Sequence, residues 1–173
     1  SSDVCSSDLL FAAAAWRSTS IVDLLVTWLF LAALVAIAGI DLAGKRVICL
    51  VDKSGSMGAI DSNTLEPTKW PTVCQTVQQV LKSLPDVEKF QVIVFSDKND
   101  YPMGKAGEWI DFDRAKSPDA VLAALAKVKP EGNTQMYGAF ETAFSYRSKG
   151  LDAIYLFSDG LPNIGPGLPA NPP

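Results

Sequence analysis

An apolar run at residues 47–51 leads directly into Asp-Lys-Ser-Gly-Ser at residues 52–56, and this junction most constrains the fold. A continuous apolar run of this kind is typical of a strand buried in a parallel sheet. Asp52, Ser54 and Ser56 then lie on one turn at the carboxyl end of that strand, where open α/β sheets bind their ligands. Because their carboxylate and hydroxyl oxygens come without imidazole or thiolate, this turn suits a hard cation such as Mg²⁺.

Two later segments support this interpretation of residues 52–56, called the serine turn below. Residues 132–134 (Gly-Asn-Thr) lie between two predicted helices, and residues 157–160 (Phe-Ser-Asp-Gly) end a second apolar strand. Ser, Gly and Asp are also ordinary turn residues, so an Asp-x-Ser-x-Ser string alone is weak evidence. The alternative is a different α/β domain in which these residues only form turns.

In this order and spacing, the three segments resemble the metal-ion-dependent adhesion site of the von Willebrand factor type A (VWA) domain family, over roughly residues 46–165. The resemblance implies five metal ligands, with the two serines bound directly and the others directly or through water: Asp52, Ser54, Ser56, Thr134 and Asp159. It also implies Mg²⁺ or Mn²⁺ as the cofactor, and a protein partner whose Asp or Glu carboxylate completes the metal's shell. One departure is Asn133, where the family often has a second Gly.

Alternating strands and helices predict an α/β fold, a doubly wound, Rossmann-like and mostly parallel sheet flanked by helices. The predicted elements are a strand at 47–51, a helix near 71–85, a strand at 91–96, helices near 117–130 and 134–150, and a strand at 153–157. The VWA domain is expected to occupy residues 45–173. The resemblance implies further strands and helices after the turn at 157–160, so the domain is expected to be truncated at its C-terminal end.

Four local features complete the predicted domain. Residues 57–67 are expected to form a long polar loop, and residues 108–111 a short edge strand. Residues 97–100 are expected to form a turn in which Asp97 is a solvated carboxylate. Ser117 is expected to be the N-cap of the helix that follows it.

The first forty residues contain two segments that need a separate interpretation. Residues 1–9 resemble a translated sequencing adapter, the alternative being a native polar tail. Residues 24–40 are uncharged and apolar, so segment 20–40 approaches the roughly 20 residues that a transmembrane helix needs. A signal peptide, with the small-x-small sequence at 36–38, and a buried core helix are the alternatives. The domain is therefore expected to be membrane-anchored, on an undetermined side, or secreted or periplasmic after cleavage.

Composition excludes several classes of function. The net charge of −4, the pI of about 4.8 and the lack of a Lys/Arg cluster argue against a nucleic-acid partner. The absence of histidine excludes Ser-His-Asp triads and His-ligated zinc. Cysteines at positions 5, 49 and 74 show no metal-binding spacing, and the last two are expected to be small buried hydrophobic residues.

The sequence therefore predicts a bacterial, membrane-tethered, metal-dependent protein-binding or adhesion module that is not an enzyme. One alternative is a substrate-recruiting module of a larger enzyme complex. Another is a haloacid-dehalogenase-like phosphatase, whose nucleophilic Asp is followed two residues later by a second Asp. Ser54 occupies that second position here, so the general acid is missing. A degenerate domain with a purely structural role is the third alternative.

Overall fold

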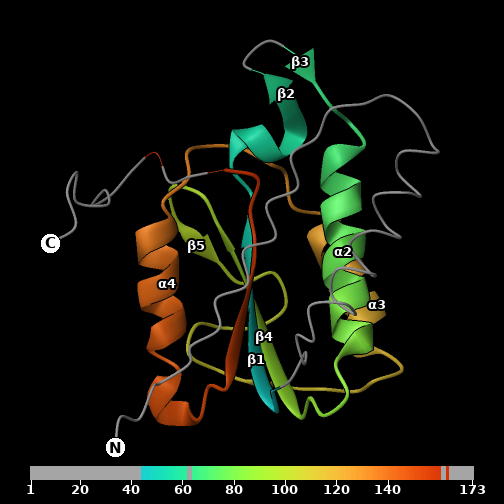
Figure 1. Cartoon of the computed structure of the whole chain (residues 1–173), viewed down its shortest axis with the longest axis vertical. Helices are drawn as coiled ribbons and strands as arrows, with labels where there is room; N and C mark the ends of the chain where they lie inside the picture. Colours follow the sequence, from blue (N-terminus) through green and yellow to red (C-terminus); the bar gives the residue numbers. More distant parts are fainter. Residues whose placement is uncertain (1–43, 62–63, 161–162, 164–173) are drawn as a thin grey trace, which may run out of the picture.

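The computed structural model describes residues 44–61, 64–160 and 163, and these form an α/β fold on a five-stranded sheet (Figure 1). Its central strands are parallel and lie in the order β4 (Lys89–Phe95), β1 (Arg46–Asp52) and β7 (Ala153–Phe157). Two short strands pair antiparallel with β4: β5 (Asn99–Asp100) and β6 (Ile110–Asp111). The predicted α/β class with a mostly parallel sheet is confirmed.

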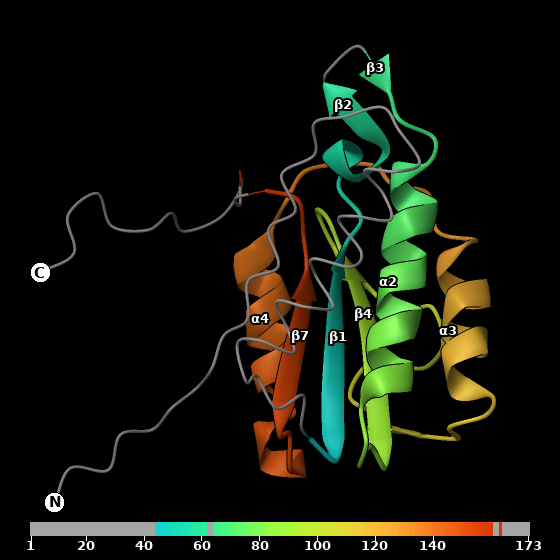
Figure 2. The ribbon, with the colours of Figure 1, turned by 45° about the vertical axis from the view of Figure 1, so that its right-hand side comes forward.

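Helices cover both faces of the sheet, which explains the apolar strands. The helices are α2 (Lys69–Ser83), α3 (Ser117–Leu125) and α4 (Met136–Phe144). Helices α2 and α3 lie on one face and α4 on the other (Figure 2). Successive side chains of a strand point to opposite faces, so Val47, Cys49 and Val51 join the cluster that contains α2 and α3. Ile48 and Leu50 join the cluster that contains α4.

Two of the expected loops contain regular structure. The expected loop at 57–67 instead contains part of a 3₁₀ helix, η1 (Gly55–Gly58), and an antiparallel pair, β2 (Ala59–Asp61) and β3 (Thr64–Leu65). The expected turn at 97–100 ends in β5, which pairs with the end of β4. Such strands of two or three residues are too short to show a period in the sequence. The expected edge strand at 108–111 is found as β6.

The start of α3 differs from the prediction that Ser117 is the N-cap. Lys116 occupies the N-cap position, and Ser117 is the first residue of the helix. The Ser117 hydroxyl accepts a hydrogen bond from the Asp113 amide at 2.9 Å. The Asp113 carboxylate in turn accepts from the amides of Ala115 at 2.9 Å and Lys116 at 3.2 Å. Asp113 therefore stabilises the turn that precedes the helix, whereas the N-cap residue Lys116 makes no capping hydrogen bond with its side chain.

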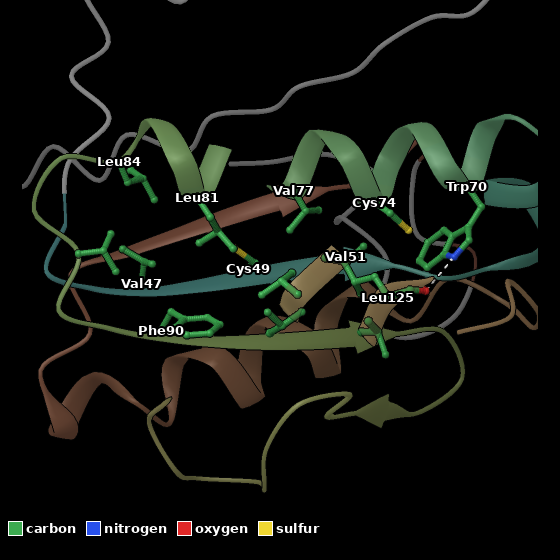
Figure 3. Packing of buried hydrophobic residues seen from close by; sticks show 14 of the residues in the cluster. Val47, Cys49, Val51, Trp70, Cys74, Val77, Leu81, Leu84, Phe90 and Leu125 are labelled. Atoms are coloured by element: carbon green, nitrogen blue, oxygen red, sulfur yellow. Dashed lines mark hydrogen bonds between the residues drawn. The ribbon is translucent and has the colours of Figure 1, made fainter. Parts of the chain in front are cut away.

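The larger core cluster lies between the sheet and α2 (Figure 3). Cys74, Val77 and Leu81 of α2 are buried against β1 and β4. At the start of the helix, Trp70 is only 7% exposed, and its indole N–H donates to the Leu125 carbonyl of α3 at 3.1 Å. The Trp70 side chain therefore links the two helices on this face of the sheet.

Cys49 and Cys74 are both buried free thiols, as expected. Burial raises the pKa of Cys49 to about 12 and that of Cys74 to about 11. Because the thiolate is the reactive form, neither thiol should react with Ellman's reagent at pH 8 in the folded protein. We expect both to react only after denaturation, measured as released chromophore before and after adding guanidinium. Immediate reaction of all three cysteines in the native chain would contradict this prediction.

None of the helices within residues 44–61, 64–160 and 163 is long and apolar enough to span a membrane. The adapter-like segment at 1–9 and the apolar segment predicted at 20–40 lie outside these described residues.

Candidate metal centre

Asp52 is the last residue of β1, and its carboxylate is completely buried at the carboxyl end of the sheet. One carboxylate oxygen accepts from the Ser54 amide at 2.8 Å, and the other accepts from the Ser158 hydroxyl at 2.8 Å. Burial raises the pKa of Asp52, whereas the hydrogen bonds from Ser54 and Ser158 act in the opposite direction. An ionised Asp52 in this position would therefore be stabilised by a nearby positive charge.

Three of the five predicted ligands form one continuous chain of oxygens. The hydroxyls of Ser54 and Ser56 are hydrogen-bonded at 3.0 Å, and the Ser56 hydroxyl donates to the Asp159 Oδ1 at 3.0 Å. Mg²⁺ binds oxygens octahedrally at about 2.0–2.1 Å, which places neighbouring ligands about 2.9 Å apart. The two spacings match neighbouring octahedral positions, and carboxylate and hydroxyl oxygens are ligands that Mg²⁺ accepts. The residues present therefore fit the expected cation.

Thr134 is buried in the loop before α4, and backbone hydrogen bonds hold this loop against the serine turn. The Gly55 amide donates to the Gly132 carbonyl at 3.0 Å, and the Glu131 amide donates to the Lys53 carbonyl at 2.7 Å. Among the described residues, no hydrogen bond joins the Thr134 hydroxyl to the other four predicted ligands. The structure thus brings the Thr134 loop to the site through its backbone.

Asn163 was not predicted to contact any ligand, yet it fixes the backbone of Thr134. Its side-chain oxygen accepts from the Thr134 amide at 2.8 Å, and its own amide donates to the Thr134 carbonyl at 3.1 Å. Asn163 follows the turn at 157–160, so it ties that segment to the Thr134 loop. Asn163 lies 29 positions after Thr134, so no local sequence pattern would predict this pair.

Asp97 is exposed in its turn, as the sequence predicts, and its carboxylate also contacts the Thr134 loop. It accepts hydrogen bonds from the Asn133 amide at 3.3 Å and the Asn133 side chain at 2.9 Å, and these bonds lower its pKa. Gly132 has a φ of +84°, and a Cβ at this position would lie 2.3 Å from the Asp97 carboxylate. Asn133 and Gly132 therefore shape the Thr134 loop through Asp97.

Lys69 contributes a positive charge that the sequence interpretation missed. It is the first residue of α2, and its ammonium forms an ion pair with the Asp159 Oδ2 at 2.5 Å. The ammonium also donates to the carbonyl of Ser56 at 2.7 Å and to that of Ala59 at 3.1 Å. Asp159 is thus hydrogen-bonded to Ser56 through one oxygen and paired with Lys69 through the other.

The donor set is poor in charge. Within the described part of the chain, no three His, Cys, Asp or Glu side chains gather into a group that could hold a metal. The site instead combines two carboxylates, from Asp52 and Asp159, with the hydroxyls of the serine turn. Carboxylate and hydroxyl oxygens are the type of ligand that a hard divalent cation accepts.

Comparison with known proteins identifies the family of the domain. Residues 47–161 match the family model described as von Willebrand factor type A domain, and this span includes the serine turn, Thr134 and Asp159. The chain belongs to the von Willebrand factor type A domain family. No curated protein matches the sequence.

Solved structures similar to this VWA domain come from several organisms. The VWF domain of a type V pili tip protein of Porphyromonas gingivalis is 16% identical, with a TM-score of 0.44, over 68% of this chain and 38% of its own. Proximal thread matrix protein 1 from the mussel byssus is 21% identical, with a TM-score of 0.47, over 71% of this chain and 31% of its own. A mutant of the PilB minor pilin of Streptococcus sanguinis is 14% identical, with a TM-score of 0.46, over 64% of this chain and 28% of its own. The chain therefore spans less than two fifths of each of these structures.

Proposed function

We propose that this VWA domain is a protein-interaction module that binds a carboxylate of its partner through a divalent cation. The cation, Mg²⁺ or Mn²⁺, would be held by the five residues Asp52, Ser54, Ser56, Thr134 and Asp159. Family membership supports the interaction role, because VWA domains are generally protein-binding modules. The observation that carries the cation is the chain of oxygens from Ser54 through Ser56 to Asp159, with spacings of 3.0 Å.

Each side chain has a separate task in this proposal. Asp52 is buried and fixed by two hydrogen bonds, so it supplies negative charge in a constant position. Ser56, the middle member of the oxygen chain, is exposed, which leaves this side of the site open to a partner. When bound, the cation supplies the positive charge that a partner's Asp or Glu requires. None of these residues needs to transfer a proton or form a covalent bond, so we propose binding without turnover.

We further propose that residues 20–40 bring the domain to a membrane, either as an anchor or as a signal peptide that directs export. This part of the proposal rests on the apolar sequence of the segment alone. Fractionation of cells that express the full chain, with and without carbonate extraction, would test it. Recovery of the chain only in the soluble cytoplasmic fraction would contradict it.

The cation is tested by thermal unfolding of the full chain with increasing Mg²⁺ or Mn²⁺. A cation that binds only the native state should stabilise it by about 2.7 kcal/mol at one hundred times its dissociation constant. We expect this shift in the parent and its loss in Asp52→Asn, which keeps an oxygen for the Ser54 amide. Asp86→Asn removes the same charge from an exposed site that precedes β4, at the opposite end of the sheet, and should behave as the parent does.

The partner's chemistry is tested on the Mn²⁺-loaded protein with a library of peptides that contain Asp, alongside copies that contain Asn instead. We expect binding of a subset of the Asp peptides that is lost in the Asn copies and abolished by EDTA. Absence of any cation-dependent melting shift up to millimolar Mg²⁺ and Mn²⁺ would refute the metal site. Equal binding of Asp and Asn peptides would refute carboxylate recognition while leaving the metal site intact.

A further inference from the structure

Each N–H donor of the Lys69 ammonium makes a hydrogen bond, and these bonds hold the side chain in place. An ammonium has three N–H groups, and the acceptors are the Asp159 carboxylate, the Ser56 carbonyl and the Ala59 carbonyl. The Lys69 side chain is 19% exposed and that of Asp159 is 15% exposed, so water screens their ion pair only partly. The pair therefore differs from an ordinary surface salt bridge, whose net effect is small.

The two oxygens of Asp159 have different partners. Oδ1 accepts from the Ser56 hydroxyl, on the side of the candidate cation, and Oδ2 faces the Lys69 ammonium. Lys69 therefore neutralises Asp159 without taking the oxygen that faces the serine turn. The nearby Lys53 cannot replace it, because the Lys53 ammonium faces the Asp100 carboxylate at 3.5 Å.

We propose that Lys69 sets the charge of the site, weakening its hold on the cation and strengthening its attraction for a partner's carboxylate. This inference rests on the proposed function. Asp52 and Asp159 carry two negative charges and Lys69 one positive charge, so the three groups sum to −1. With a divalent cation the sum becomes +1, which attracts an anion. Without Lys69 it would be zero, and the full charge of Asp159 would act on the cation.

Replacing Lys69 should therefore change the affinity for the cation and the affinity for a carboxylate in opposite directions. In Lys69→Met, which keeps the apolar stem but removes the charge, we expect Mn²⁺ to bind about tenfold more tightly. We expect acetate, the simplest carboxylate, to bind the Mn²⁺-loaded variant several-fold more weakly than the loaded parent. A purely structural role for Lys69 would weaken both affinities together, because loss of the Lys69 hydrogen bonds would disorder the serine turn and Asp159.

The experiment measures Mn²⁺ binding to the full chain by isothermal titration calorimetry. It then follows acetate binding through the water-proton relaxation of bound Mn²⁺, with chloride at equal ionic strength as the reference. Lys69→Arg keeps the charge and should stay close to the parent in both affinities. Lys89→Met breaks the ion pair with Asp111 at the opposite end of β4 and should change neither affinity. Lys69→Gln replaces Lys69→Met should the latter fail to fold.

The possible results separate the two proposals. Tighter Mn²⁺ and weaker acetate in Lys69→Met support the charge-setting role. Mn²⁺ binding that is unchanged or weaker in Lys69→Met, with clear binding to the parent, overturns this inference and leaves the proposed function standing. Absence of Mn²⁺ binding in the parent and in every variant overturns the metal site and this inference with it. Binding in Lys69→Met but not in the parent overturns both the proposed function and this inference, because the parent site would then hold no cation to attract a carboxylate.

Discussion

Trp70→Ala is expected to lower the free energy of unfolding by about 3–5 kcal/mol, the usual cost of removing a large buried aromatic side chain. Trp70 is 7% exposed in the first turn of α2 and packs in the cluster that joins this helix to β1 and α3. Its indole also donates to the Leu125 carbonyl. Urea denaturation followed by circular dichroism measures the loss without relying on tryptophan fluorescence.

Two further variants separate packing from hydrogen bonding at Trp70. Trp70→Phe keeps much of the apolar contact, and the Leu125 carbonyl still accepts from the Val128 amide at 2.9 Å. We therefore expect Trp70→Phe to lose less than half as much stability as Trp70→Ala. Tyr137 is 55% exposed, so Tyr137→Ala should change stability little. A loss in Trp70→Ala no larger than in Tyr137→Ala would show that Trp70 does not hold the two helices together.

Gly132→Ala is expected to destabilise the protein by about 1–3 kcal/mol and to weaken any cation-induced stabilisation. The φ of +84° strains any residue with a Cβ, and the new Cβ would lie 2.3 Å from the Asp97 carboxylate. Asp97 must then turn away and lose its hydrogen bonds to Asn133. Because the Gly132 carbonyl accepts from the Gly55 amide, the movement reaches the serine turn.

Gly160→Ala provides the matched control for Gly132→Ala. Gly160 follows Asp159 directly, yet a Cβ there would meet nothing within 4 Å. We expect Gly160→Ala to match the parent in urea denaturation and in the melting shift caused by Mg²⁺. Equal stability of the two variants would mean that the left-handed backbone at Gly132 does not constrain the loop that carries Thr134.

The long elements of this fold could be predicted because their patterns extend over whole elements. β7 begins at Ala153 and ends at Phe157 as predicted, since an apolar run bounded by polar residues defines both ends. The expected helix near 71–85 corresponds to α2 at Lys69–Ser83, where apolar residues recur at helical spacing. The pair β2 and β3 could not be predicted in this way, because each strand has only two or three residues.

The candidate site also contains residues that a sequence pattern predicts and residues that it does not. Asp52, Ser54 and Ser56 were predicted from a local motif, and the sheet then brings Asp159 beside them because parallel strands end at one edge. Lys69 carries no such motif, and its partner Asp159 lies 90 residues further along the chain. Its role depends on the direction of one side chain at the start of α2. Residue order alone does not determine that direction.

The hydrogen bond between Ser56 and Asp159 spans 103 residues, and the bond between Asp52 and Ser158 spans 106. At synthesis rates of about 5–20 residues per second, a nascent chain presents its serine turn for roughly 5–20 s before Asp159 is made. During that interval the turn lacks the groups that complete the oxygen network. Under the proposed function, cation capture and partner recognition would therefore be delayed until β7 has joined the sheet, and an incomplete domain would not bind its partner during translation.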